Sequence, residues 1–121
     1  MNFKGLKTSF VNAGKGVKYV FKHEQNFRIQ IFISILVILL AWFVDVSRAE
    51  WVLLILIMLA IMSLELINSA VEKFSDVIKP RLSDQVKIIK DIMAAVVLLA
   101  SLGSIIIGLI IFWPHLVALF F

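Results

Sequence analysis

The chain has 121 residues, of which 62% are hydrophobic, and its formal net charge is +4. Soluble domains are typically about 45–50% apolar, and here the excess lies in long continuous blocks, which excludes an ordinary soluble protein and indicates an integral membrane protein. The length allows three spans with short connections, so we expect one domain over residues 1–121. The absence of cysteine excludes disulfides and thiolate metal ligands.

Residues 3–24 have the pattern of an amphipathic helix. At about 100° per residue, one arc is apolar and the opposite arc is basic. The apolar arc holds Leu6, Phe10, Ala13, Val17, Val20 and Phe21, and the basic arc holds Lys4, Lys7, Lys15, Lys18 and Lys22. Such a helix beside a span is typical of the membrane interface. Glu24 breaks the pattern, because it projects onto the apolar arc, where a merely solvated acid is not expected.

Three apolar blocks follow, and they predict transmembrane helices over 27–44, 51–72 and 92–112. About 20 helical residues cross the roughly 30 Å hydrocarbon core of a bilayer. The polar link DVSRAE (45–50) is short enough for a tight turn, whereas a longer polar segment containing Pro80 precedes the third span. The predicted fold class is an all-α integral membrane protein with three transmembrane helices and an N-terminal amphipathic surface helix.

Basic residues gather on one side of the predicted membrane. They precede the first span, and they recur between the second and third spans as Lys73, Lys79, Arg81, Lys87 and Lys90. By the positive-inside rule, the N-terminus and the segment 73–90 are cytoplasmic and the C-terminus is outside. We therefore expect a multi-pass protein of the plasma membrane, with its polar site at the cytoplasmic face and no nucleic-acid partner.

The second span ends in SLELINSAVEKFSD (63–76), which brings three acids and an amide close to the membrane. On a helical wheel the polar residues fall within about 120°; they are Glu65, Asn68, Ser69, Glu72, Ser75 and Asp76. This polar stripe is expected to face a protein interior or a wet cleft rather than lipid. A structural salt bridge is a weak explanation, because the spans hold no Lys or Arg beyond Lys90, and intramembrane carboxylates are generally functional. For Asp76, in the expected loop region, an ordinary solvated acid is an open alternative.

Glu24, Glu72 and the pair Lys90 and Asp91 are expected at one depth, near the cytoplasmic interface. Carboxylates together with substrate phosphates form a typical Mg²⁺ site, because this ion takes few protein ligands and keeps waters. A nearby lysine neutralises nucleotide phosphates. Glu65 lies deeper, at the level of a lipid headgroup, where partial desolvation suits a general base. The combination predicts phosphoryl transfer from ATP to a lipid alcohol, without a P-loop.

ELINSAVEKFSD (65–76) followed by KIIKD (87–91) resembles the signature of the prokaryotic diacylglycerol kinase and undecaprenol kinase family. That signature is E-[IL]-[ILV]-N-[ST]-A-[IV]-E with a downstream K-D pair. SFVNAGKGVKYVFKHEQNFRI (9–29) is similar to the N-terminal region of the Gram-positive branch. The resemblance covers essentially the whole chain. It implies a homotrimeric membrane kinase with three spans, a surface helix and active sites shared between subunits.

The resemblance also implies roles for single residues. Glu65 matches the family's proposed general base, and Glu24 and Glu72 match the pair that holds Mg²⁺ with the ATP phosphates. Nucleotide binding would fall to Lys90, Asp91, Asn68, Glu24 and Glu72, and lipid binding to Glu65, Asn68 and Ser69. Sharing of the site between subunits would bring Glu24 to the other groups.

Two departures from the family pattern concern the ATP side of the site. Relatives often carry a histidine where this chain has Ser83, and they tend to have Ala and Gly after the K-D pair, where this chain has IMAAVVLL. The lipid is a separate question. The Gram-positive-like N-terminal region favours undecaprenol, and diacylglycerol stays the alternative.

Two other functional classes fit parts of the sequence. A small proton-coupled transporter would use Glu65 as its titrating carboxylate, but it needs polar residues in both halves of the membrane, and the outer halves of these spans are almost wholly apolar. A structural or assembly protein would leave Glu65, Glu72 and Lys90 unexplained. A lipid kinase is therefore the predicted function.

Overall fold

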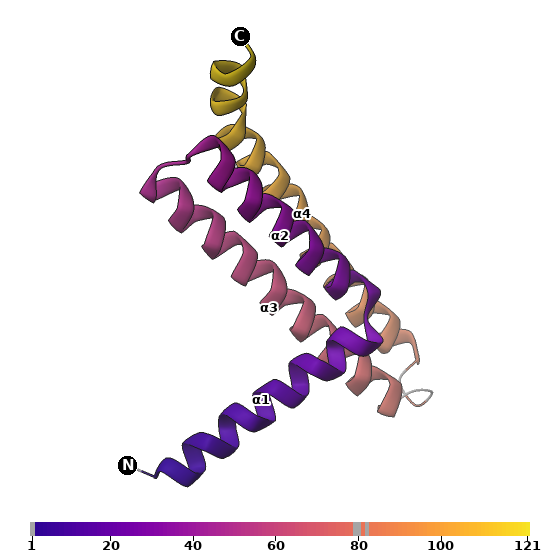
Figure 1. Ribbon diagram of the computed structural model, residues 1–121. Coiled ribbons are helices and arrows are strands. Elements are labelled where there is room, and N and C mark those ends of the chain that lie inside the picture. Colours follow the sequence, from indigo (N-terminus) through magenta and orange to yellow (C-terminus); the bar gives the residue numbers. More distant parts are fainter. Residues whose placement is uncertain (1, 79–80, 82) are drawn as a thin grey trace.

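The described residues form four helices, of which three make up a bundle and one projects from it. A computed structural model of the chain describes residues 2–78, 81 and 83–121; Lys79 and Pro80 of the expected cytoplasmic segment lie outside the described residues. The helices are α1 (Phe3–His23), α2 (Gln25–Val44), α3 (Arg48–Ile78) and α4 (Ser83–Phe120). Figure 1 shows α2, α3 and α4 side by side, with α1 leaving the bundle at a steep angle near the α3–α4 connection.

Among the described residues, α2, α3 and α4 are long and apolar enough to cross a membrane. Their outward faces carry large exposed apolar side chains, including Phe32, Leu99 and Ile110. Such an extensive apolar surface is unsuited to water, whereas helices with all backbone bonds made internally are stable in lipid. The arrangement fits a multi-pass membrane protein.

The junction between α1 and α2 is fixed by Arg28. Glu24 adopts an extended conformation between the two helices (φ −116°, ψ 110°). The Arg28 guanidinium then donates through Nη1 to the carbonyl oxygens of Phe21 at 2.7 Å and Lys22 at 3.0 Å. These carbonyls belong to the last turn of α1, where no intrahelical partner is available and a positive charge is favourable. Arg28 therefore sets the position of Glu24 at the base of the bundle.

The turn between α2 and α3 is closed by backbone bonds. Asp45 is left-handed (φ 59°), a conformation that aspartate tolerates better than most residues. Its N–H donates to the Trp42 carbonyl at 3.3 Å, and the Val46 N–H donates to the Ala41 carbonyl at 3.2 Å. This is the Schellman pattern of a helix end. Val46 is buried and packs in one cluster with Ala41, Leu54, Ile111 and Phe112.

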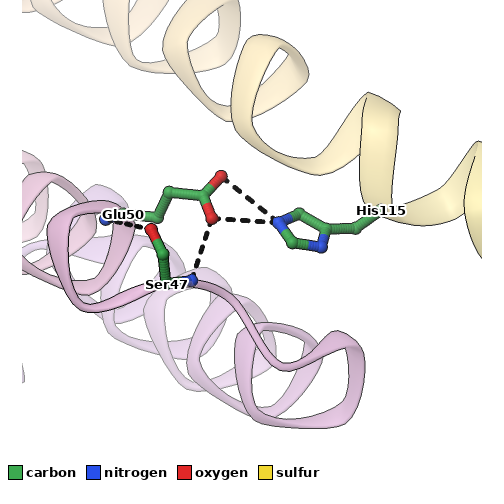
Figure 2. A network of polar contacts seen from close by, with 3 residues as sticks. All are labelled: Ser47, Glu50 and His115. Atoms are coloured by element: carbon green, nitrogen blue, oxygen red, sulfur yellow. Dashed lines mark hydrogen bonds and ion pairs between the residues drawn. The ribbon is translucent and has the colours of Figure 1, made fainter.

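A second set of bonds starts α3 and ties it to α4 (Figure 2). The Ser47 N–H donates to Glu50 Oε1 at 2.9 Å, and the Glu50 N–H donates to Ser47 Oγ at 3.2 Å. This reciprocal pair is a capping box. From α4, Nε2 of His115 lies 3.0 Å from Oε1 and 3.3 Å from Oε2 of Glu50. The Ser47–Glu50–His115 network thus joins the N-terminal end of α3 to α4 one residue past Pro114.

The helices α3 and α4 are longer than the spans expected from the apolar blocks. The helix α3 continues to Ile78, so that Asp76 is helical rather than part of a loop, and α4 begins at Ser83. The expected polar segment 73–90 is therefore helical at both ends. Its side chains are polar enough to continue the helices into water, and the exposed pair Lys87 and Asp91, 2.9 Å apart, supports the first turns of α4 at i,i+4 spacing.

Candidate functional site

The polar stripe of α3 faces the inside of the bundle, as its helical periodicity predicts. Glu65, Ser69 and Ser75 are only 4%, 7% and 1% exposed. On the opposite side of the same helix, Phe74 and Val77 are 65% and 75% exposed. The helix α3 therefore turns Glu65, Ser69 and Ser75 inward and Phe74 and Val77 outward, the arrangement that lipid requires, whereas Asp76, the last residue of the stripe, is exposed.

The stripe lines a polar pocket of about 420 Å³ between α2, α3 and α4. Four of the residues selected from the sequence meet there, namely Glu65, Asn68, Glu72 and Lys90. The remaining walls are formed by Asn26, Ile29, Gln30, Ala94, Val97, Leu98 and Ser101. Acidic, amide and ammonium groups thus share one cavity, and Gln30, Glu65 and Ser101 line its end towards the middle of the bundle.

Two hydrogen bonds order the charged groups of this pocket. Nδ2 of Asn68 donates to Oε1 of Glu72 at 3.4 Å, which holds the two side chains on one face of α3. Nζ of Lys90 donates to Oδ1 of Asp76 at 3.4 Å. Asp76 thus has a partner on α4, and the ammonium group of Lys90 stands between Asp76 and the pocket.

Three other selected residues lie outside the pocket. Asp91 pairs with Lys87 on the exposed side of α4. Glu24 is half-buried at the α1–α2 junction and does not line the pocket. Ser69 lies against α1 instead, in a second cavity with Tyr19 and Lys73; among the described residues, no hydrogen-bond partner reaches its Oγ.

Asn26 and Gln30 of α2 line the pocket but were not selected from the sequence. A signal for them exists, since these two amides are four residues apart and fall on one face of a helix that is mainly apolar beyond Gln30. Polar groups in a span are costly unless they face a protein interior or a water-filled cavity. Periodicity alone does not show which face of α2 packs towards α3, because this depends on tertiary packing.

The donor set is suited to a hard cation held by few protein groups. Glu72 presents a carboxylate that is oriented by the Asn68 amide N–H, and the Glu65 carboxylate lies on the same helix face. Within the described ranges, no cluster of three or more His, Cys, Asp or Glu side chains forms a complete cage. Mg²⁺ needs no such cage, because it commonly binds one or two carboxylates together with substrate phosphates and waters. The residues present therefore fit a magnesium–nucleotide complex.

Comparison with known proteins identifies the family of this chain. The family model for prokaryotic diacylglycerol kinase matches residues 11–112. The undecaprenol kinase of Bacillus subtilis is 35% identical over 108 residues, which cover 89% of this chain and 88% of that protein. The diacylglycerol kinase of Synechocystis sp. is 35% identical over 115 residues (94% of this chain and 66% of that protein). The diacylglycerol kinase of Escherichia coli K12 is 31% identical over 101 residues (84% and 83%).

Proposed function

Because the chain belongs to the prokaryotic diacylglycerol kinase family and is therefore a lipid kinase, we propose that it transfers the γ-phosphoryl group of ATP directly to the hydroxyl of undecaprenol. The products would be undecaprenyl phosphate and ADP, without a covalent enzyme intermediate. The observation that carries this proposal is the single pocket that holds Glu65, Asn68, Glu72 and Lys90. It offers a base, a metal-ligating carboxylate and a phosphate-binding cation within one cavity.

The depth of each group along α3 supports a division of roles. Glu65 is buried at the end of the pocket towards the middle of the bundle, where a lipid hydroxyl would arrive from the membrane, and it would accept the proton of that hydroxyl. Asn68 is one turn nearer the cytoplasmic end, between Glu65 and Glu72, and it would orient the lipid head within the pocket, whereas Ser69 would contact the lipid only from the cavity against α1. Lys90 and Asp91 at the start of the third span would contact the nucleotide.

Magnesium is proposed as the cofactor. Glu72 would hold it, with Glu24 as second carboxylate and Asn68 fixing the Glu72 side chain through their 3.4 Å hydrogen bond. When bound, the ion neutralises charge on the β- and γ-phosphates of ATP. The position of Glu24 outside the pocket favours a site completed between subunits of a homotrimer, in which Glu24 would come from a neighbouring copy.

The choice of lipid rests on the relatives. The Bacillus subtilis relative is named an undecaprenol kinase and matches over nearly its whole length. Other relatives are named diacylglycerol kinases, so that diacylglycerol, giving phosphatidic acid, is the alternative substrate. We further propose that the N-terminus is cytoplasmic, that α1 lies along the cytoplasmic membrane surface, and that the pocket opens on that side of the plasma membrane.

The test is transfer of label by the purified protein in bilayer nanodiscs with γ-labelled ATP and Mg²⁺. Undecaprenol and diacylglycerol are offered separately at equal mole fraction. We expect labelled undecaprenyl phosphate as the main product, with diacylglycerol phosphorylated more slowly. A higher kcat/KM for diacylglycerol would reverse the substrate assignment, and transfer to neither lipid would refute the proposed reaction.

A further inference from the structure

Lys90 supplies the positive charge of the polar pocket. Among the described residues, it is the one basic side chain that lines this cavity, which it shares with Glu65 and Glu72. The neighbouring lysines have other contacts. Lys73 lies over the ring of a tyrosine on α1, 5.5 Å from the ring centre, and Lys87 is paired within α4. An anionic ligand that enters the pocket therefore meets the ammonium group of Lys90.

The ammonium group of Lys90 is paired with a carboxylate outside the pocket. Its Nζ donates to Oδ1 of Asp76 at 3.4 Å, and Asp76 does not line the cavity. Asp76 follows Glu72 by four residues, so it stands one turn further along the same face of α3. Lys90 thus connects the α4 wall of the pocket with a carboxylate one turn beyond it.

The carboxylates inside the pocket are not paired with Lys90. Glu72 accepts a hydrogen bond from the Asn68 amide instead. Within the described ranges, no ion pair joins Lys90 to Glu65 or Glu72. The pairing with Asp76 therefore leaves the proposed base and the proposed metal ligand without a lysine, and it keeps a positive charge beside them.

The contact between Lys90 and Asp76 is a loose one. Hydrogen bonds between an ammonium group and a carboxylate are usually about 2.7–2.9 Å long, whereas this one is 3.4 Å. Both side chains are accessible to solvent, and water weakens such exposed pairs. An ammonium group also has three donors. A more highly charged anion can therefore replace Asp76 without breaking a buried contact.

We propose that Asp76 is the counter-ion of Lys90 in the nucleotide-free protein, and that the nucleotide phosphates replace it when they bind. This inference rests on the proposed function, because it requires a nucleotide in the pocket. The exchange opposes the binding of nucleotide, since one ion pair must be given up for another. It favours the release of ADP, because Asp76 pairs with Lys90 again as the phosphates leave. Asp76 is thus a positioning residue that acts through Lys90.

Asp76→Asn tests the exchange, because it removes the charge and keeps the shape of the side chain. The measurement is the Kd of a fluorescent ADP analogue with Mg²⁺, for the protein in nanodiscs. We expect the Kd to fall by about threefold, because an exposed ion pair no longer competes with the phosphates. The single-turnover rate at saturating ATP should stay near the wild-type value, because Asp76 does not line the pocket. A merely structural role would instead weaken binding and lower this rate.

Two control variants separate the charge of Asp76 from its position. Asp76→Glu keeps the carboxylate and should leave the Kd near the wild-type value. Asp84→Asn removes an equal charge from an exposed position in the first turn of α4, and it should also leave the Kd unchanged. An equal fall of the Kd in Asp84→Asn and Asp76→Asn would overturn the proposal, because net charge alone would then explain it.

A double-mutant cycle shows whether Asp76 acts through Lys90. In a Lys90→Gln background, Asp76→Asn should leave the Kd unchanged, because there is no ammonium group to exchange. The same fall of the Kd in both backgrounds would indicate direct repulsion between Asp76 and the nucleotide, and it would contradict the exchange. Wild-type affinity in Lys90→Gln alone would do so too, since Lys90 would not bind the phosphates.

The results also distinguish this inference from the proposed function. Unchanged or weaker binding in Asp76→Asn, with wild-type protein still transferring phosphoryl groups to a lipid, would overturn the inference and leave the kinase reaction intact. Wild-type protein that binds the ADP analogue but transfers to neither lipid would refute the proposed function alone.

Discussion

Glu65 shows how the position of one carboxylate determines what it can do. It is buried and shares its pocket with an ammonium group and a second carboxylate. A base that accepts a proton in the transition state contributes about 10²–10⁴-fold to a rate. Glu65→Gln keeps the size and shape of the side chain and removes this capacity.

We therefore expect Glu65→Gln to lower kcat by about 10²–10⁴-fold with little change in ATP affinity. The measurement combines single-turnover transfer to undecaprenol with binding of a fluorescent ATP analogue. Glu50→Gln, the same change at the opposite end of α3, is the matched control and should retain turnover. Near wild-type turnover in Glu65→Gln would show that another group is the base.

Glu72 has a different predicted role from Glu65, although both belong to the same stripe. Its carboxylate is hydrogen-bonded to Asn68 at the end of the pocket nearer the α3–α4 connection. Glu72→Gln should raise the Mg²⁺ concentration for half-maximal activity by at least about tenfold, because a neutral amide binds a hard cation less well than a carboxylate does. A Mg²⁺ titration at saturating ATP measures this, and an unchanged midpoint would remove Glu72 from the metal ligands.

The sequence predicts the residues of one helix face better than the meeting of several faces. Helical periodicity is enough to put Glu65, Asn68 and Glu72 together, since all three belong to α3. Asn26 and Gln30 join them through the packing of α2 on α3, and Asp76 meets Lys90 through the approach of α3 and α4. Contacts between helices depend on how each helix is rotated about its axis and shifted along it relative to its neighbour. The periodicity of one sequence gives neither quantity.

For the helices, the structure differs from the sequence-based prediction more at the helix ends than in the middle of the spans. The apolar blocks identify the three spans, because lipid demands a minimum length of apolar helix. They do not identify where α3 and α4 stop, because polar turns beyond the membrane are stabilised by water and by local pairs such as Lys87 and Asp91. The Ser47–Glu50–His115 network has a local part, the capping box, which sequence spacing can indicate. Glu50 and His115 are 65 residues apart in the sequence, so local sequence spacing cannot predict their contact.

This network makes a prediction about coupling between α3 and α4. The side chains of Glu50 and His115 are 25% and 26% exposed, whereas those of Lys87 and Asp91 are 77% and 65% exposed. Exposed pairs at i,i+4 spacing contribute about 0.3–0.5 kcal/mol. We expect a double-mutant cycle of Glu50→Ala and His115→Ala to give a coupling energy of about 1 kcal/mol or more, within the usual range for contacting residues.

The Lys87→Ala and Asp91→Ala cycle is the control, and both are measured as shifts in denaturant-induced unfolding in mixed micelles. We expect the coupling energy of the partly buried pair Glu50 and His115, which joins two helices, to exceed that of Lys87 and Asp91. Equal coupling energies, or a larger value for Lys87 and Asp91, would show that the outer contact does not tie α4 to α3.

For the whole molecule, the unequal distribution of basic residues predicts its orientation. The chain has no cysteine, so that a single introduced thiol can be located without background. Ser9→Cys on α1 should react with a membrane-impermeant maleimide only after the cells are permeabilised, and Ala49→Cys in the first turn of α3 should react in intact cells. Both positions are exposed. The opposite labelling pattern would invert the topology and move the polar pocket to the outer face.

The tight α2–α3 turn has a consequence for movement during turnover. The end of the bundle at the α2–α3 turn is held by the Schellman hydrogen bonds, the capping box and His115, together with the cluster around Ala41. At the opposite end, α3 and α4 are joined by the 3.4 Å pair of Lys90 and Asp76, whose side chains are 37% and 65% exposed. The three long helices are therefore held more rigidly at the α2–α3 turn than at the end where Lys90 meets Asp76. We expect the helices to separate at that second end when ATP enters and the lipid phosphate leaves, while the end at the α2–α3 turn keeps its geometry throughout the cycle.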